Sequence, residues 1–492
     1  MTTPINITSR LELFTDDALI ESMKDAELRL HQPTPTADVF ETDRPWEGNM
    51  CSYVTVLRDG PLCRMYYKTW KADLGRDADG NVYHSFAPLA IACAESLDGI
   101  HWHRPEYGVC EVNGSKRNNV VWLGDGDDDK IQKGTHGFAP FIDRNPDCLP
   151  EQRYKAVGAD MGDGGGSLWA MVSPDGIHWQ LLQEAPIITG YPFDSQNLVF
   201  YDTIRGEYRI YLRDFAKGNF TGARGIRTAT SPDFINWTDA EWLEYPGIPE
   251  QQLYTSQIMP YPRAPHIFVG FPTRYTERSW CPAVEAMPEV EHRRLRSDVS
   301  ERYGSAVTDG LFMSSRDGKT FKRWSEAFLR PGPRAYGSWT YGDMYQAWGM
   351  LETESDLPGA PRELSLYATE GYWRGDSTTI RRYTIRMDGF VSVNAPFSGG
   401  EFVTKPLTFD GSRLTLNMST SGAGSIRVEI QDATGTTLDG FSLDDCDEVI
   451  GDEIERTVTW GGGSDLSQHA GTPIRLRFVL SDADLYAMRF VE

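Results

Sequence analysis

Short apolar runs, each about as long as one β-strand, recur along most of the chain and are separated by polar turns. Four of these runs lead into one phrase, which begins with serine, carries aspartate two positions later and ends in an aromatic residue. Its copies span residues 96–102, 173–179, 231–237 and 315–321. In three copies glycine follows the aspartate, and Asp-Gly supplies the positive φ of a tight hairpin turn. The phrase therefore predicts a repeated β-hairpin.

Further strand-like runs lie upstream of each copy. Before the third copy they span residues 197–202 and 208–213, with a turn between them. Two such runs and the hairpin make a unit of four antiparallel strands, which is the blade of a β-propeller. A fifth unit, over residues 344–386, has the strands without the phrase. The pattern predicts a five-bladed β-propeller.

After residue 389 the pattern changes to alternating apolar and polar positions between Gly-rich turns. Segments 413–419, 425–432 and 474–480 are examples, and this texture is typical of an antiparallel β-sandwich. We therefore expect an all-β protein with three parts. Residues 1–45 form an N-terminal extension that caps the propeller, residues 46–389 form the propeller, and residues 390–492 form the sandwich.

Composition narrows the classes of partner and compartment. Hydrophobic residues make up 40% of the chain and aromatic residues 12%, which is enough for a large core. A formal net charge of −23 disfavours nucleic acid and anionic membrane partners. No basic and apolar leader and no membrane-length apolar run occurs, and the seven cysteines lack metal or disulfide spacing. We expect a cytoplasmic protein without a cofactor, although a secreted chain whose signal had been removed would look the same.

The predicted propeller brings distant residues to one mouth of its channel. There the starts of the first and third strands of each blade meet the ends of the second strands. The first strands supply Glu47, His136, Asp194, Tyr254 and Asp343. The second strands supply Trp70, Asp160, Arg213, Arg274 and Glu370, and the third strands add Arg227 and Asp309. Carboxylates interleaved with arginines and aromatic rings are the lining that a sugar-cleaving site needs.

Glycosidic cleavage uses one carboxylic acid to protonate the leaving oxygen and one carboxylate to attack or to activate water. Asp194 is the first candidate for nucleophile or base, because the Ser, Gln and Asn that follow it can orient it. Glu47 is the first candidate for the acid, since Trp46 gives it an apolar flank, and Glu370 competes for that role. Asp343 is a further catalytic candidate that, like Asp309, could instead hold substrate hydroxyls.

Simpler interpretations stay open for these residues. An acidic residue at a strand end is commonly a turn or cap residue, and His136 can be a hydrogen-bonded structural histidine. Residues 125–129 resemble the start of a calcium loop, but Lys130 stands where an EF-hand needs glycine and His136 where it needs glutamate. An EF-hand is therefore excluded, while a looser cation site stays open.

These motifs together resemble a known group of enzymes. The repeated phrases, the stretches 194–202, 308–318 and 364–373, and the C-terminal strands look like a bacterial glycosyl-hydrolase-like branch over about residues 40–492. That branch is similar to the two-domain invertases, inulinases and levanases, whose five-bladed propeller is shared by arabinanases and xylosidases. The resemblance implies a propeller with a C-terminal β-sandwich and action on glycosidic bonds.

The chain departs from the invertase motifs at three places. Invertases carry Asn-Asp-Pro-Asn on the first blade, where residues 46–49 read Trp-Glu-Gly-Asn. They carry Arg-Asp-Pro on the second blade, where residues 138–141 read Phe-Ala-Pro-Phe, and Glu-Cys on the third, where residues 194–195 read Asp-Ser. The roles of acid and base are therefore not carried over from the family.

We expect a glycoside hydrolase that acts on a neutral oligo- or polysaccharide, with a furanoside such as an arabinofuranoside or fructoside preferred by resemblance. A glycoside phosphorylase is an alternative, with Arg213, Arg227 and Arg274 as a phosphate site. A noncatalytic glycan-binding propeller is another. In each case the partner is a carbohydrate, with no nucleic acid or membrane, and the oligomeric state is open.

Overall fold

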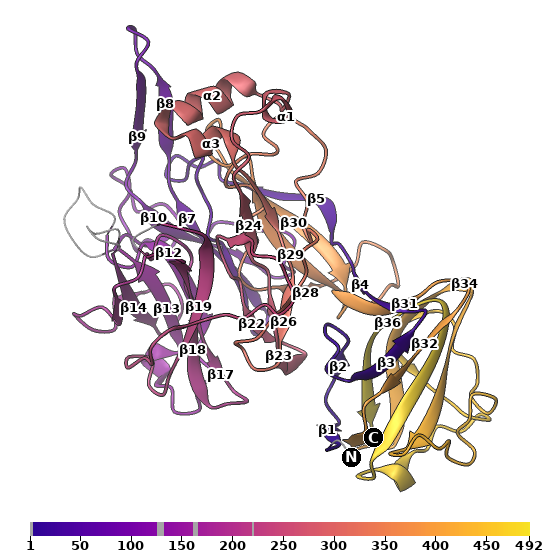
Figure 1. The fold of residues 1–492 in the computed structure, drawn as a ribbon. Coiled ribbons are helices and arrows are strands. Elements are labelled where there is room, and N and C mark those ends of the chain that lie inside the picture. The colour runs from indigo at the N-terminus through magenta and orange to yellow at the C-terminus, as the bar shows by residue number, and fades with distance from the viewer. Residues whose placement is uncertain (1–2, 125–131, 161–165, 219–220) are drawn as a thin grey trace.

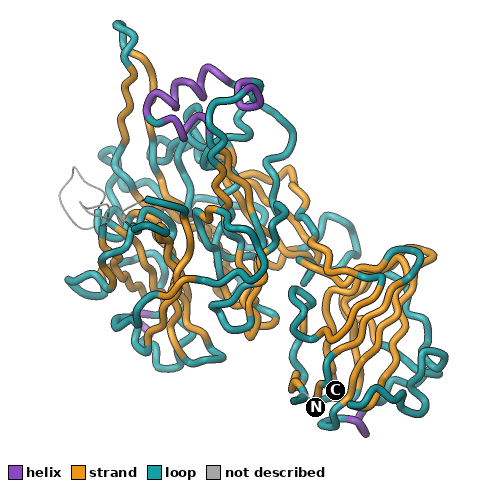
Figure 2. Tube along the Cα trace, in the orientation of Figure 1, coloured by secondary structure: helices purple, strands orange, loops and turns teal. Residues whose placement is uncertain are grey.

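The protein is built almost entirely from β-strands. The computed structural model describes residues 3–124, 132–160, 166–218 and 221–492. Figure 2 shows how few helices these residues contain. They are α1 (Pro282–Glu285), α2 (Val290–Val299), α3 (Glu301–Ser305) and the 3-10 turns η1 (Pro150–Gln152) and η2 (Ser467–His469). The prediction of an all-β protein is confirmed at this level, and no helix within the described ranges is long and apolar enough to cross a bilayer.

Five antiparallel sheets follow one another along the chain. The first contains β6 (Thr55–Asp59), β7 (Leu62–Thr69), β10 (Ala90–Ser96) and β11 (Val120–Trp122). The second contains β12 (His136–Ile142), β13 (Tyr154–Ala159), β14 (Ser167–Ser173), β15 (Gln180–Leu181) and β16 (Ile188–Thr189). The third contains β17 (Leu198–Asp202), β18 (Glu207–Phe215), β19 (Arg224–Ser231) and β20 (Glu241–Trp242).

The fourth and fifth sheets continue this order with one exception. The fourth contains β22 (Met259–Tyr261), β23 (Ala264–Gly270), β26 (Met313–Ser315) and β27 (Lys322–Arg323). The fifth contains β28 (Leu351–Thr353), β29 (Glu363–Glu370), β30 (Thr379–Arg386) and, beside β30, the N-terminal strand β5 (Thr34–Glu41). The fourth strand of the fifth sheet thus comes from the opposite end of the chain.

The repeated phrase forms the turn that leaves the third strand of the first four sheets. In the second copy Ser173 Oγ accepts the N–H of Gly176 at 2.9 Å, and Asp175 Oδ1 accepts two further backbone N–H groups at 2.9 Å. Gly176 has a φ of 79°, which glycine adopts without strain. In the third copy Phe234 takes this place with a φ of 71°. The serine and aspartate are therefore what the four turns share, and glycine is not obligatory.

Tyrosines of second strands tie these turns to a different sheet. Each donates its hydroxyl to the carbonyl oxygen of a glycine in a repeated turn. The pairs are Tyr66 with Gly176 at 2.9 Å, Tyr211 with Gly318 at 2.8 Å, and Tyr367 with Gly99. The last pair joins the fifth sheet to the first, so the two ends of the series of sheets are in contact.

The N-terminal residues differ from the predicted cap. Strands β1 (Ile5–Thr8), β2 (Glu12–Leu13), β3 (Ile20–Lys24) and β4 (Glu27–Leu30) belong to the C-terminal sheet, and β5 belongs to the fifth sheet. Ile7, Leu13 and Ile20 are buried. These strands pair with strands from the other end of the chain and bury their apolar side chains there. The sequence of residues 1–45 alone does not reveal those partners, so it could not predict this arrangement.

The C-terminal part is a ten-stranded sheet around its own apolar core, and the chain termini lie side by side in it (Figure 1). Its other strands are β31 (Val391–Ala395), β32 (Gly400–Thr404), β33 (Leu407–Phe409), β34 (Arg413–Asp432), β35 (Asp452–Thr457) and β36 (Ile474–Val491). All described pairings in this sheet are antiparallel except that of β1 with β33.

Three insertions lie outside the sheets described so far. They are the hairpin β8 (Ala72–Arg76) and β9 (Val82–Phe86), the helices α1 to α3, and the sheet of β21 (Gln252–Leu253), β24 (Thr273–Thr276) and β25 (Val307–Gly310). Figure 1 shows the hairpin and the helices together at the end of the molecule remote from the C-terminal sheet. Arg76 of the hairpin pairs with Asp298 of α2, so the two insertions support one another.

Candidate active site

Five side chains, one from the beginning of each sheet, meet in a single group. The ring of Tyr53 packs edge-on against His136 with centroids 5.4 Å apart. His136 Nε2 lies 3.2 Å from Asp194 Oδ1. On the other side of Tyr53 the ring of Tyr345 lies 6.2 Å away, and Tyr345 is 5.4 Å from Tyr254. Residues that are far apart in sequence are thereby gathered around one point.

Arg213, from β18, joins the two ends of this group. Its guanidinium lies 3.5 Å from Asp194 Oδ2 and 4.9 Å from the centre of the Tyr254 ring. The six residues, named here the Asp194 cluster, are Tyr53, His136, Asp194, Arg213, Tyr254 and Tyr345. Four of them, His136, Asp194, Arg213 and Tyr254, were predicted from their positions in the repeat.

Asp194 is the carboxylate of the cluster, and its side chain keeps 29% of its surface exposed. Burial by the surrounding rings acts to raise its pKa, but the hydrogen bond from His136 and the positive charges of Arg213 and Arg302 outweigh this and lower it. His136 is buried, and burial lowers the pKa of its imidazole despite the neighbouring carboxylate. Asp194 is therefore an ionised carboxylate that solvent reaches, beside a neutral histidine.

Lys68 is a functional candidate that the sequence prediction missed. Only 1% of the residue is exposed, and its Nζ lies 4.8 Å from the ring centre of Tyr53 and 4.6 Å from that of Trp70. Burial lowers the pKa of its ammonium to about 8, although the charge of Asp194 acts in the opposite direction. Side chains two residues apart in a strand lie on the same face, so Lys68 shares a face with Trp70. Trp70 was predicted as a site residue, and this alternation was the sequence signal that could have identified Lys68.

Arg302 is a second missed residue, because the helices that carry it were not predicted. Its guanidinium donates to Tyr303 Oη at 3.2 Å and to Tyr341 Oη at 3.4 Å. Tyr341 in turn donates to Tyr254 Oη at 3.1 Å. Proline is common in the first turn of a helix, and Pro282 stands at the start of α1. It was the sequence signal that could have predicted a helix in this highly charged segment.

Aromatic rings surround the cluster on several sides. Tyr372 stacks on Tyr345 with centroids 6.5 Å apart, and Trp373 packs against Tyr303 at 5.2 Å. Trp70 stacks on Phe86 of β9 at 4.8 Å. Aromatic side chains combine an apolar body with a polar tip, which suits a ligand that has both apolar and hydroxyl-bearing faces.

Glu47 does not have the apolar surroundings that the sequence predicted. Its side chain is fully buried, with Oε1 2.8 Å from Arg104 Nε and 2.5 Å from the hydroxyl of Tyr67. Oε2 accepts the N–H of Arg44 at 3.0 Å. Glu47 is therefore held by three partners outside the Asp194 cluster, and its role as the acid stays a prediction.

Glu370 and Asp343 lie together at a different place. Both line a cavity of about 790 Å³. Glu370 accepts two hydrogen bonds from Arg381 Nε, at 2.8 and 3.0 Å, and one from Tyr383 at 2.7 Å. Asp343 accepts the N–H of Tyr372 at 2.9 Å, and burial raises its pKa to about 7. Asp343 therefore holds a proton to higher pH than an ordinary aspartate does.

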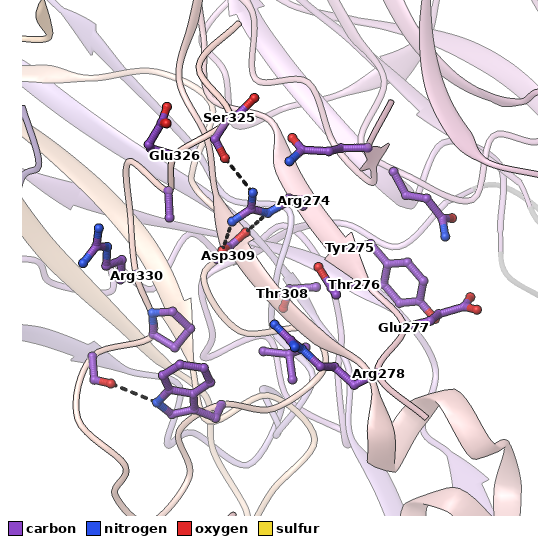
Figure 3. A pocket seen from close by; sticks show the side chains of 17 residues that line it. Arg274, Tyr275, Thr276, Glu277, Arg278, Thr308, Asp309, Ser325, Glu326 and Arg330 are labelled. Atoms are coloured by element: carbon purple, nitrogen blue, oxygen red, sulfur yellow. Dashed lines mark hydrogen bonds and ion pairs between the residues drawn. The ribbon is translucent and has the colours of Figure 1, made fainter. Parts of the chain in front are cut away.

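Arg274 and Asp309 belong to a larger cavity of about 990 Å³, which Figure 3 shows from close by. Arg274 Nε and Nη2 lie 2.8 and 2.5 Å from the two oxygens of Asp309, and Arg274 Nη1 donates to the Ser325 carbonyl at 2.7 Å. Tyr275 also lines this cavity, and its ring packs 6.2 Å from that of Tyr254. The cavity therefore lies next to the Asp194 cluster, and Tyr275 stands between the two.

The two remaining predicted residues hold local structure. Asp160 accepts the indole N–H of Trp169 at 2.8 Å and the backbone N–H of Ser167 at 2.7 Å. Arg227 pairs with Asp214 at 2.7 Å and lies over the ring of Trp242. The calcium-like stretch 125–129 lies outside the described residues. Within the described part of the chain no group of three or more His, Cys, Asp or Glu side chains is arranged to hold a metal.

The chain shows low similarity to several solved structures. No family model matches the chain. No curated protein sequence matches it. It is similar to an N-acetylgalactosamine deacetylase from F. plautii, with 12% identity over 73% of this chain and 94% of that one and a TM-score of 0.43. It is also similar to a glycosyl hydrolase from Bacteroides ovatus, with 14% identity over 78% and 100% of the two chains and a TM-score of 0.42.

A third similar structure is an endo-arabinase from Bacteroides thetaiotaomicron. It shares 10% identity over 72% of this chain and 98% of its own, with a TM-score of 0.40. Likeness of this degree assigns no chemistry to individual residues. What the site can do follows from the groups gathered around Asp194.

Proposed function

We propose that the protein is a glycoside hydrolase in which Asp194 acts as the nucleophile or as the general base. The observation that carries the proposal is the state of this carboxylate, which is ionised, 29% exposed and set among side chains from five sheets. Glycosidic cleavage needs such a carboxylate on one face of the sugar. Glu47 and Glu370, by contrast, are occupied by Arg104 and Arg381.

The proposal includes an architecture. The five sheets are taken as the blades of a five-bladed propeller with the Asp194 cluster at one mouth of its channel. The contact of Tyr367 with Gly99, between the fifth sheet and the first, supports closure of the ring. The propeller then comprises residues 46–389 with β5 added, and the C-terminal sheet, with β1 to β4, is a β-sandwich.

Asp343 is the proposed proton donor. Its pKa of about 7 and the lowered pKa of Asp194 are driven apart by their surroundings, which is the pattern that separates an acid from a base in one enzyme. Asp343 is bonded to the backbone of Tyr372, which stacks on Tyr345 of the cluster. A direct transfer needs the Asp343 carboxyl within hydrogen-bond reach of the leaving oxygen, so the substrate would have to extend into the cavity that Asp343 lines.

A substrate screen with one variant tests the hydrolase. Aryl glycosides and oligosaccharides, with arabinofuranosides and fructosides first, are incubated with the protein, and products are followed by proton NMR. The change Asp194→Asn keeps the size of the side chain and removes the charge, so we expect it to lower kcat by about 10³-fold or more while the melting temperature changes little. Full activity in this variant would refute the assignment.

The phosphorylase and the noncatalytic binder are outcomes of the same screen. The three arginines first considered for phosphate do not share one site, because Arg227 is paired with Asp214 and Arg274 with Asp309. Release of a sugar 1-phosphate only when phosphate is added would identify a phosphorylase. Binding without turnover on any glycan, unchanged in Asp194→Asn, would identify a binding protein.

A further inference from the structure

We propose that the site around Asp194 binds an anionic group, a carboxylate or a phosphate, through Lys68, Arg213 and Arg302. The inference rests on the proposed function for its setting, since it names the class of ligand that the same site takes. It differs from the neutral glycan that the sequence led us to expect. Three observations, one for each cation, carry it.

Lys68 is a buried cation that lacks a carboxylate partner among the residues described. Its contacts are with ring faces, at 4.8 Å for Tyr53 and 4.6 Å for Trp70. Ring faces attract a cation but do not accept its N–H groups as a carboxylate does. Burying an ammonium costs free energy unless it is paired and hydrogen-bonded, so an anion at this point would supply what the protein does not.

Arg213 has hydrogen-bonding capacity to spare. Only 3% of the residue is exposed, and within the described structure its Nε and one Nη find no hydrogen-bond partner of good geometry. The nearest carboxylate oxygen, on Asp194, is 3.5 Å away, and the guanidinium otherwise lies over the rings of Phe215 and Tyr254. A planar guanidinium with free donors is suited to bind carboxylate or phosphate oxygens.

Arg302 adds a third positive charge from the side of the helices. It donates to the hydroxyls of Tyr303 and Tyr341, which are neutral partners. Tyr341 links it to the site by donating to the hydroxyl of Tyr254, in the Asp194 cluster, at 3.1 Å, and its charge is one of those that lower the pKa of Asp194. No ion pair between Arg302 and a carboxylate occurs in the described ranges.

The sum of charges at this point is opposite to that of the whole chain. Lys68, Arg213 and Arg302 are three cations that interact electrostatically with one ionised carboxylate, Asp194, in a protein whose formal net charge is −23. The imidazole of His136 adds no charge, since burial lowers its pKa. Cations confined among low-polarity walls create a local field that favours an anion, whereas sugar hydroxyls alone would leave two positive charges uncompensated.

Two sources of the anion share this chemistry. The first is the carboxylate of a uronic acid within the glycan, and the second is free phosphate acting as a co-substrate. Binding is measured by isothermal titration calorimetry with D-galacturonate, inorganic phosphate and, as the neutral reference, D-galactose. We expect at least one anion to bind wild type at least tenfold more tightly than galactose.

Matched variants locate the binding. Lys68→Gln and Arg302→Gln should each weaken anion binding about tenfold, whereas Lys68→Arg, which keeps the charge, should retain most of it. Lys71→Gln is the control, because Lys71 carries the same charge three residues away with 42% of its side chain exposed and is paired with Asp376. Thermal melting of each variant shows whether it is folded.

Each outcome decides the proposal. Binding of galacturonate alone assigns the site to the glycan's own carboxylate, and binding of phosphate assigns it to a phosphate co-substrate. The proposal is overturned if neither anion binds more tightly than galactose, or if folded Lys68→Gln and Arg302→Gln bind as wild type does. Asp194→Asn separates the two claims, because it should abolish glycan cleavage yet retain or strengthen anion binding. Cleavage by that variant would refute the hydrolase alone.

Discussion

His136 Nε2 lies 3.2 Å from Asp194 Oδ1, with the imidazole buried and the carboxylate still in reach of solvent. This contact helps to lower the pKa of Asp194. In His136→Ala the pKa of Asp194 should therefore rise towards its ordinary value. Because activity needs the ionised form, we expect the acidic limb of the kcat/KM profile to move to higher pH.

The control for this change is His178→Ala, which removes a histidine that also contacts an aspartate but is 67% exposed in a repeated turn. Its profile should match that of wild type. Superimposable acidic limbs for His136→Ala and wild type would show that His136 does not act on Asp194.

Glu47 and Arg104 form a buried ion pair, so the change Glu47→Gln should act on stability rather than on chemistry. Removing the charge of Glu47 leaves Arg104 with only the exposed carboxylate of Asp43, 3.6 Å away, which costs about 3 kcal/mol in the free energy of unfolding. Urea denaturation measures this loss, and kcat of the folded variant should remain within a few-fold of wild type. A large fall in kcat at unchanged stability would return Glu47 to the catalytic candidates.

Asp343 makes stability depend on pH in a defined direction. Its pKa is about 7 in the folded protein against an ordinary value of 3.8, so between these values the folded state binds more protons than the unfolded state. The contribution of Asp343 to the free energy of unfolding therefore falls as pH rises through this range. Asp343→Asn cannot ionise at this position. The melting temperature of the variant minus that of wild type should therefore increase between pH 5 and about 8.

The same variant tests the role of Asp343 as proton donor. Loss of a general acid lowers activity on substrates with poor leaving groups and has little effect on aryl glycosides with good ones. Equal loss of activity on both kinds of substrate would assign Asp343 to holding the backbone of Tyr372 instead.

Gly176 in the second repeated turn should not tolerate a side chain. Its φ is 79°, and an added Cβ would lie 2.6 Å from Tyr66 Oη and 2.8 Å from an Arg64 nitrogen. We expect Gly176→Ala to cost about 2–4 kcal/mol in unfolding free energy. Gly60→Ala is the matched control, because Gly60 has a φ of 59° with no atom within 4 Å of its added Cβ, and it should cost about 1 kcal/mol. Equal losses would mean that the contact with the first sheet adds nothing.

The repeat was informative because it is local. Serine and aspartate fold back on their own backbone in each turn, so a seven-residue phrase predicts its own hairpin and the strand before it. The partner of β5 was not predictable in this way, since Thr34–Glu41 pairs with Thr379–Arg386 and nothing within either segment names the other. Pairing across such distances is decided by the whole fold.

The same distinction between local pattern and tertiary contact applies to the candidate site. Position within the repeat brought His136, Asp194 and Tyr254 together, but it could not predict the ion pair of Glu47 with Arg104, which is 57 residues away. Lys68 was missed because a lysine in a strand is ordinarily solvated, and its burial depends on Tyr53 and Trp70. Position can be predicted from periodicity, while the charge state of a side chain depends on neighbours that only the tertiary structure supplies.

The pairing of the N-terminal strands limits how early they can fold during synthesis. Each of β1 to β5 pairs with a strand that lies beyond residue 378, in β30 to β33 or in β36. On the ribosome these first strands have no partner until most of the chain has been made. Neither the fifth sheet nor the C-terminal sheet can be completed earlier, so the strands of residues 5–41 wait for strands made more than 300 residues later before they can pair.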